Sequence, residues 1–199
     1  MRSMKPCLLV LIFVATAICS LPAQESHQAP SRPLPPQLPI FSPAELAAKV
    51  PTAKAEDVNS LDSIMRALYE VISGPAGTRD WNRFRSIFLP QARFTEVHKS
   101  DEGFSVITWN VDEFIRDATD VFSREGFYES AIVNFPERYG NMAQVFSSYE
   151  SRHAPGEKPF TRGINSVQLL NDGTRWWVVS IAWDSERPNN PLPKKFSKK

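Results

Sequence analysis

The sequence predicts an α+β domain in which helices come early and a mostly antiparallel sheet follows. Between residues 58 and 122, apolar residues recur at spacings of three and four in three separate stripes, the pattern of helices that bury one face. From residue 127 to 184 the chain reads as a series of strands, and the last hairpin is marked by Asp172-Gly173. Helices gathered against a sheet of this kind define the α+β class.

The amino terminus has the composition of a secretory signal peptide. Arg2 and Lys5 precede an apolar run, residues 8–18, that is too short to span a bilayer. We expect residues 1–19 to be removed, with cleavage after Cys19 or as far as Ala23, and the domain to be exported to the periplasm or the cell exterior. A lipid anchor on Cys19 is the alternative, although Ile18 before it fits that processing poorly.

Removal of this segment changes what the mature chain can do. Cys7 and Cys19 are the two cysteines, so neither a disulfide nor a cysteine metal site is expected. The formal charge falls from +1 to −1 as Arg2 and Lys5 leave. A chain with a net charge near zero is not expected to have the basic surface that binds nucleic acid. No second apolar segment is long enough to cross a membrane.

Proline-rich segments flank the expected domain. Residues 20–55 form a linker, because seven prolines between positions 22 and 43 favour an extended chain without a core. Within it, Ser42-Pro43 predicts a short helix that Pro51 ends. A proline- and lysine-rich tail, residues 188–199, is expected to be disordered. The domain therefore spans residues 56–187.

The elements of the domain follow from local signals. The spacing predicts one continuous helix over 58–72 and a second from Thr78, as N-cap, to Pro90. Strands are expected over 92–98 and 104–108. Asn110 and Glu113 form a capping box that starts a third helix. Long strands follow over 127–135 and 142–152, with a connection at 136–140.

The final hairpin assigns residues to the two faces of the sheet. A two-residue loop at Asp172-Gly173 sets Gln168 opposite Trp177 and Arg162 opposite Trp183, and cross-strand partners share a face. One face then carries Arg162, Ile164, Gln168, Trp177, Val179, Ile181 and Trp183; the other carries Asn165, Val167, Leu169, Trp176, Val178, Ser180 and Ala182.

The segment FRSIFLPQARFTE, the final DGTRWWVVSIAW and the order of elements resemble the nuclear transport factor 2-like superfamily, in particular its SnoaL-like bacterial members. The resemblance covers roughly residues 57–184. It implies a cystatin-like cone, in which a curved sheet wraps three helices around a ligand pocket, and often dimerisation through the outer sheet face. The superfamily includes isomerases, dehydratases and pure binding modules, so the activity stays open.

Comparison with the ketosteroid-isomerase branch implies candidate roles. Glu96 falls at the position of the proton-transferring base, Tyr69 near that of the oxyanion tyrosine, and Trp183 at that of an aromatic residue in the last strand. Arg162 replaces a protonated carboxylic acid, and its guanidinium would pair with Glu96 or with an anionic ligand.

Strand alternation supports part of this site. Phe94, Glu96 and His98 share one face, and an apolar Phe94 directs that face toward the core. Desolvation there would raise the pKa of the Glu96 carboxyl and suit it to general-base chemistry. The plainer alternatives are a Glu96–Arg162 ion pair without chemistry, a core tyrosine at position 69 and a solvated His98.

The preferred hypothesis is an exported domain that binds a small apolar ligand, with Arg162 receiving any anionic group. Phe94, Gln168, Trp177 and Trp183 would line the pocket. One alternative is a lyase or isomerase with Glu96 as base and Tyr69 or His98 as polariser.

Another alternative is a non-catalytic module of the cell envelope. The face with Trp176 and Val178 predicts a homodimer interface. No cofactor motif is found, and His27, His98 and His153 lack metal-ligand spacing, so no metal is expected.

Overall fold

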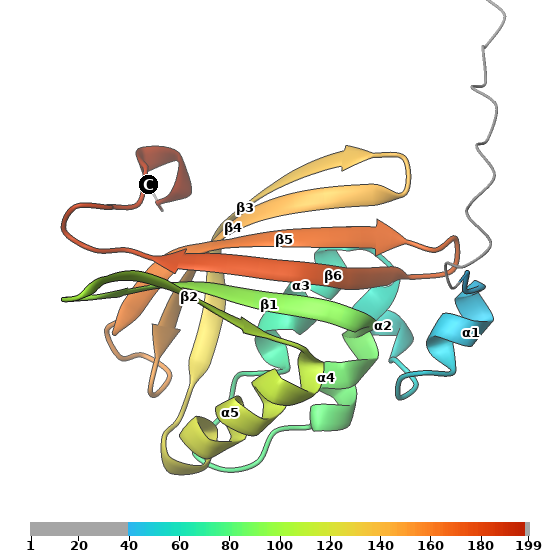
Figure 1. Ribbon diagram of the computed structural model, residues 1–199, viewed down its shortest axis with the longest axis horizontal. Coiled ribbons are helices and arrows are strands. Elements are labelled where there is room, and N and C mark those ends of the chain that lie inside the picture. Colours follow the sequence, from blue (N-terminus) through green and yellow to red (C-terminus); the bar gives the residue numbers. More distant parts are fainter. Residues whose placement is uncertain (1–39, 198–199) are drawn as a thin grey trace, which may run out of the picture. The chain divides into compact units, whose positions relative to one another are not determined.

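A six-stranded sheet with the order β2-β1-β6-β5-β4-β3 is the frame on which the structure is built (Figure 1). The computed structural model describes residues 40–197. The predicted signal peptide, the Cys19 anchor and the linker up to residue 39 lie outside the described residues. The strands are β1 (Phe88–Ser100), β2 (Gly103–Trp109), β3 (Tyr128–Tyr139), β4 (Met142–Arg152), β5 (Thr161–Asn171) and β6 (Trp176–Ser185).

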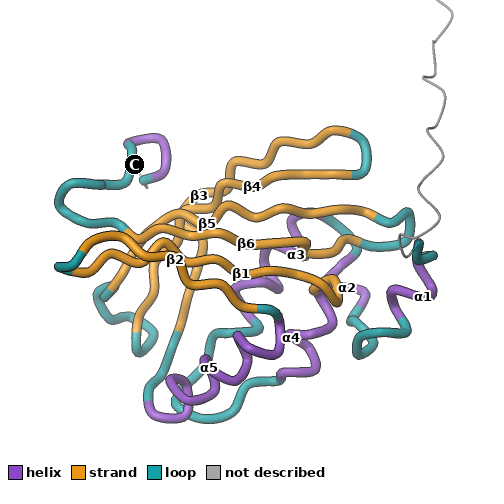
Figure 2. The backbone as a smooth tube through the Cα atoms, viewed as in Figure 1, coloured by secondary structure: helices purple, strands orange, loops and turns teal. Residues whose placement is uncertain are grey.

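The longer helices lie together on one face of the curved sheet (Figure 2). We call this the inner face and the opposite one the outer face. The helical elements are α1 (Pro43–Ala47), α2 (Ala55–Val58), α3 (Leu61–Glu70), α4 (Trp81–Ile87), α5 (Val111–Arg124) and the 3-10 turn η1 (Lys194–Phe196). The predicted α+β class, with helices on one side of a curved and mostly antiparallel sheet, is confirmed.

Capping residues set the helix ends. The predicted capping box is present at Asn110–Glu113 before α5, and the short helix predicted after Ser42, α1, begins with a second box, Ser42–Glu45. The single helix predicted over 58–72 is instead two, because the Ser60 hydroxyl accepts a hydrogen bond from the Ser63 amide and starts a new helix. Asp80, rather than Thr78, caps α4, and its carboxylate accepts from the amide of Arg83.

Two prolines that the sequence analysis placed at breaks lie inside strands. Pro90 is in β1, where the pairing with β6 shifts between Phe88 and Arg93. Pro136 is in β3, which is an edge strand of the sheet. Proline has no amide donor, and it is tolerated on an edge strand where that donor would face away from the neighbouring strand. The β3–β4 hairpin therefore turns at Gly140, which has a φ of +56°.

One parallel pair, β1 with β6, joins the two halves of the sheet; the other four pairs are antiparallel. In this pair Phe94 lies beside Ile181 and Glu96 beside Trp183. The last strand of the domain is thus held between the first strand and the antiparallel β5, which brings residues from both ends of the domain to one place.

The register of the β5–β6 hairpin differs from the prediction. The loop spans Asp172 to Arg175 rather than two residues, because the Asp172 carboxylate accepts hydrogen bonds from the amides of Thr174 and Arg175. Leu170 therefore pairs with Trp177, and a bulge at Val179 then shifts the pairing once more. Asn165 consequently lies opposite Trp183, and both are on the inner face.

The core lies between the inner face and the helices. Val167 and Leu169 of β5 and Trp176 and Val178 of β6 are buried there with residues of α3, α4 and α5. The prediction that Trp176 and Val178 form an outer surface for dimerisation is therefore wrong, since both side chains are less than 5% exposed within this core.

Residues 188–197, part of the tail whose composition predicts disorder, lie on the outer face. Phe196 is buried against Phe135 and Phe146, with ring centroids 4.9 and 6.2 Å away. The amide of Leu192 donates to Glu186 at 2.9 Å. This part of the chain therefore covers apolar side chains of β3 and β4.

Candidate functional site

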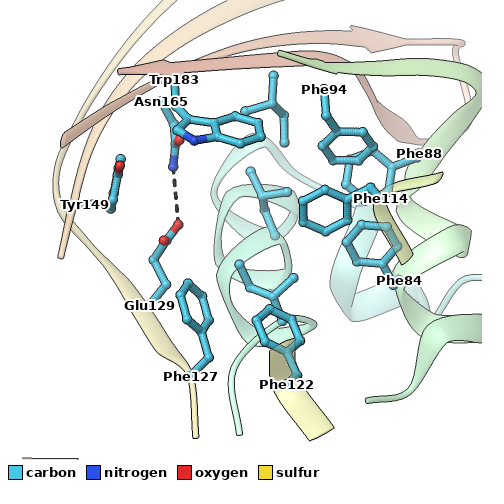
Figure 3. Close-up of a pocket in the computed structure, with 13 residues that line it drawn as sticks. Phe84, Phe88, Phe94, Phe114, Phe122, Phe127, Glu129, Tyr149, Asn165 and Trp183 are labelled. Carbon is cyan, nitrogen blue, oxygen red and sulfur yellow. Dashed lines mark hydrogen bonds between the residues drawn. The ribbon is translucent and has the colours of Figure 1, made fainter. Parts of the chain in front are cut away.

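A cavity of about 150 Å³ lies between the inner face and the helices (Figure 3). Its lining comes from α3, α4, α5 and all strands except β2. It is aromatic over most of its surface and polar at one end. The lining residues are Leu68, Ile72, Phe84, Phe88, Phe94, Phe114, Phe122, Phe127, Glu129, Tyr149, Asn165, Ile181 and Trp183.

A carboxyl group, that of Glu129 on β3, forms the centre of the polar end. Its Oε2 accepts a hydrogen bond of 2.8 Å from the Ser151 hydroxyl, and its Oε1 accepts one of 3.4 Å from Nδ2 of Asn165. Burial raises the pKa of Glu129 to about 7, since these two neutral donors offset only part of the cost of desolvating the charge. Glu129 can therefore hold or release a proton near neutral pH.

Tyr149 of β4 completes the polar end. Its hydroxyl lies 3.2 Å from that of Ser185, and its side chain is buried. Burial, together with the nearby charges of Glu129, Glu96 and Asp184, raises the pKa of Tyr149 to about 12. It is a neutral phenol that can donate a hydrogen bond. Room for Tyr149 exists because Gly163 lies beneath it: a Cβ there would be 2.6 Å from the phenol oxygen.

Tyr69 lies behind Asn165 rather than on the cavity wall. Its hydroxyl is hydrogen-bonded to that of Ser147 and accepts a bond of 3.3 Å from Asn165 Nδ2. Burial and the charge of Glu129 raise the pKa of Tyr69. The amide of Asn165 is thus shared between Tyr69 and Glu129, which fixes its orientation.

The opposite end of the cavity is a cluster of phenylalanine rings. Phe84 and Phe114 stack with centroids 5.4 Å apart and planes 3° from parallel, and Phe114 stacks on Phe94 at 4.6 Å. In Figure 3 this cluster lies across the cavity from Glu129 and Tyr149. The cavity therefore has one polar end and one apolar end.

Glu96 and His98 lie on the inner face, as alternation predicts, but beyond the cavity. Glu96 is beside Trp183 in register, its side chain is 28% exposed, and His98 Nδ1 lies 3.8 Å from its carboxylate. Neither side chain lines the cavity. Trp183 and Phe94, predicted to contact the ligand, do line it.

The other residues predicted to line the pocket are placed elsewhere. Arg162 and Gln168 alternate with the inward Gly163 and Leu169, so they lie on the outer face, where Arg162 pairs with Glu186 at 2.7 Å. The Glu96–Arg162 ion pair is therefore absent from the described chain. Trp177 is buried outside the cavity lining, and its indole donates to Asp172 at 2.7 Å.

Sequence reasoning missed Glu129, Asn165 and Tyr149. A usable signal existed for Asn165: positions 163, 165, 167 and 169 are Gly, Asn, Val and Leu, while 162, 164, 166 and 168 are Arg, Ile, Ser and Gln. The first set is the more apolar and should face inward. For Glu129 no such signal existed, because the bulge at Ile132 interrupts the alternation of β3.

Glu129 also lies on the wall of a second, wider groove between α3, β3 and the loop after β4. This groove, of about 880 Å³, is lined by charged side chains such as Arg66, Glu70 and Arg152. Glu129 is the residue that the two linings share. The carboxyl group therefore separates the aromatic cavity from a polar, open surface.

Residues 40–197 contain no cluster of three or more His, Cys, Asp or Glu side chains that could hold a metal ion. Within the same range, none of the helices has the length and apolar character needed to cross a bilayer.

Comparisons with known proteins give matches in structure alone. No protein-family model matches the sequence, and a comparison with curated proteins finds no match. An NTF-2 like protein of unknown function from Silicibacter pomeroyi is similar, with a TM-score of 0.47, 16% identity, and coverage of 64% of this chain and 94% of that one.

Two further solved structures are described as having a cystatin-like fold. The first, a protein of unknown function from Nostoc punctiforme, has a TM-score of 0.48, 10% identity and coverage of 65% and 92% of the two chains. The second, an uncharacterised protein from Caulobacter vibrioides, has a TM-score of 0.49, 12% identity and coverage of 66% and 90%.

Proposed function

We propose that this chain binds a small, largely apolar molecule in the aromatic cavity, with one polar group of the ligand placed at Glu129. The observation that carries the proposal is the carboxyl of Glu129 at one end of a cavity whose other end is a cluster of phenylalanine rings. Such a mixture of apolar walls and a few convergent polar groups is typical of ligand sites. Export is part of the proposal and is supported by the sequence of residues 1–19.

The cavity limits the size of the ligand. A volume of about 150 Å³ corresponds to a single six-membered ring, since apolar cavities of about this size take up benzene. The flat walls made by Phe94, Phe114 and Trp183 suit a planar ring. Arg162 was the predicted partner of an anionic ligand, but its guanidinium is on the outer face, so the proposed ligand carries no acid group.

The experiment is a calorimetric titration of the exported domain with toluene, benzyl alcohol and cyclohexanone. We expect saturable binding that Ile72→Phe removes, because the larger side chain fills the cavity it lines. Arg162→Ala, on the outer face, is the matched control and should bind as the parent does. Equal binding by the Ile72→Phe variant would place the ligand elsewhere and contradict the proposal.

A second candidate function is proton transfer on such a ligand, as in an isomerase or lyase. The observation that favours it is the pKa of Glu129, about 7, because a general base is most effective when its pKa is near the working pH. Glu129 takes the role assigned to Glu96 from sequence. A carbonyl oxygen of the ligand would accept from the Tyr149 hydroxyl while Glu129 removes a proton from the adjacent carbon.

Exchange of the α-protons of cyclohexanone in D₂O, followed by NMR, tests this second function. Glu129 would remove a proton to leave an enolate, exchange that proton for a deuteron from the solvent, and return the deuteron to the same carbon. We expect exchange above the buffer rate, and its loss in Glu129→Gln with binding retained. Exchange that persists in Glu129→Gln, or that is lost in Glu96→Gln instead, would contradict the role of Glu129.

A further inference from the structure

We infer that the cavity selects a ring bearing a protonated amine over neutral or anionic molecules of the same shape. This inference rests on the proposed ligand binding and names its ligand class. It is argued from three features of the cavity: the charge of its lining, the free acceptor capacity of Glu129 and the aromatic side chains near it.

The lining contains one ionisable acid and no cation. Among the residues of the described chain that line the cavity, none is lysine, arginine or histidine. When Glu129 is ionised, its charge is stabilised there only by neutral donors, Ser151 and Asn165. Glu129 is half-buried, and a charge held partly out of water without a counter-ion is unfavourable, so a ligand that brings the opposite charge relieves that cost.

The carboxylate keeps room for such a ligand. A carboxylate has about four acceptor positions, and Ser151 and Asn165 occupy one on each oxygen. Asn165 is in turn held by Tyr69. An ammonium group, which has three donors and no acceptor, complements the positions that remain on Glu129.

Aromatic side chains lie around this point. In Figure 3, Trp183 and Phe127 lie on either side of the Glu129–Asn165 pair. Aromatic faces attract cations through their quadrupole, most strongly when the cation is desolvated. A carboxylate combined with aromatic walls is therefore a site for an alkylammonium group, while the phenylalanine cluster receives the ring.

The titratable and charged groups that face Glu129 come from α3, β4 and the wider groove. Tyr69 of α3 and Tyr149 of β4 are phenols whose pKa values are raised, so both are neutral. In the wider groove behind Glu129 lie Arg66, Arg152, Asp62, Glu70 and Glu157, of which the two arginines pair with Glu70 and Glu150. No arginine is within ion-pair distance of Glu129 in the described chain.

Benzylamine, benzyl alcohol and benzoate share one shape and differ in charge, so their affinities for the exported domain test the inference. We expect benzylamine to bind at least tenfold more tightly than benzyl alcohol at pH 8, and benzoate not to bind. Benzylamine should bind about tenfold more weakly at pH 6 than at pH 8, because Glu129 must lose a proton to pair with it. Benzyl alcohol should show little dependence on pH.

The matched variant is Glu129→Gln, which keeps shape and hydrogen bonding but removes the charge. It should lose the preference for benzylamine and its pH dependence, and still bind benzyl alcohol. Benzyl alcohol binding as tightly as benzylamine would overturn the inference and leave the proposed function intact. Failure of all three compounds and of toluene to bind would overturn the proposed function itself.

Discussion

The carboxylate of Asp172 accepts a hydrogen bond from the indole of Trp177 at 2.7 Å, across the turn that joins β5 to β6. The other oxygen of the same carboxylate accepts from the amides of Thr174 and Arg175. One side chain therefore organises a four-residue loop and fixes Trp177 in place. This loop sets the register next to the turn, where Leu170 pairs with Trp177, and the bulge at Val179 then sets which residues farther along the hairpin face the cavity.

We expect Asp172→Ala to destabilise the domain by about 2–4 kcal/mol, because several hydrogen bonds, some to a charged acceptor, are lost together. Asp172→Asn is the matched variant: it keeps one acceptor oxygen for the turn but places an amide donor opposite the Trp177 indole. In urea unfolding, the free energy of unfolding should be highest for the parent, lower for Asp172→Asn and lowest for Asp172→Ala. An Asn variant as stable as the parent would show that the indole bond contributes nothing.

Stability should fall as the pH rises from about 5 to 8. The pKa of Glu129 is raised from 4.5 to about 7 by burial, so the folded state binds a proton in this range that the unfolded state has released. The proton favours folding at low pH, and the benefit is lost as the pH passes through 7; its size is about 1–3 kcal/mol. Melting temperatures at pH 5 and pH 8 measure it, and Glu129→Gln should flatten the difference.

The Arg83–Asp57 pair should be a main support of the helical layer. Asp57 is fully buried and accepts two hydrogen bonds of 2.8 Å from Arg83, which lower the pKa of its carboxyl. Arg83→Met leaves that carboxylate unpaired and should cost about 3–5 kcal/mol.

The control for this prediction is Arg85→Met. Arg85 also lies 2.8 Å from a carboxylate, that of Asp112, but Asp112 is 77% exposed. We expect this loss to cost less than about 1 kcal/mol. Comparable losses from the two substitutions in urea unfolding would mean that burial of Asp57 is not what makes its ion pair important.

Replacing Phe196 tests both the tail and self-association. Phe196 covers Phe135 and Phe146 on the outer face, and Phe196→Ala should lower stability by about 2–3 kcal/mol. Homodimerisation through the outer face remains a proposal. If it uses these residues, the variant should dimerise more strongly in light scattering with size exclusion; an unchanged mass would place any dimer interface elsewhere.

Much of the fold could be predicted because the signals are local. The capping box at Asn110–Glu113 and the apolar stripes of α3 and α5 depend on residues three or four apart, and the structure has them. The prediction of a two-residue loop between β5 and β6 failed for a reason that is also local. Asp-Gly suits a two-residue turn, but the Asp172 carboxylate favours a longer loop because it accepts hydrogen bonds from the amides of Thr174 and Arg175.

The candidate site was harder to predict, because a shift of one residue in register exchanges the faces of a strand. The prediction turned Arg162 and Gln168 inward and Asn165 outward because it did not include the bulge at Val179. The longer loop moves the pairing by two residues, which exchanges no face, and the bulge adds the odd step that does. The bulges at Val179 and Ile132 are not visible in the residue pattern, although they decide which side chains of β6 and β3 reach the cavity. Phe94 and the inner-face position of Glu96 were predictable because β1 alternates without interruption from residue 93. The place of Trp183 in the cavity lining was predicted from the family resemblance.

The parallel pairing of β1 with β6 determines when the cavity can form during synthesis and folding. Phe94 and Ile181 are about 90 positions apart in the chain yet neighbours in the sheet, and contacts between such distant residues form slowly. The sheet stays open until its last strand has been synthesised, and the cavity, lined from Leu68 to Trp183, does not exist before then. A chain that ends before β6 therefore lacks part of the cavity lining, so the proposed ligand binding requires synthesis through Trp183.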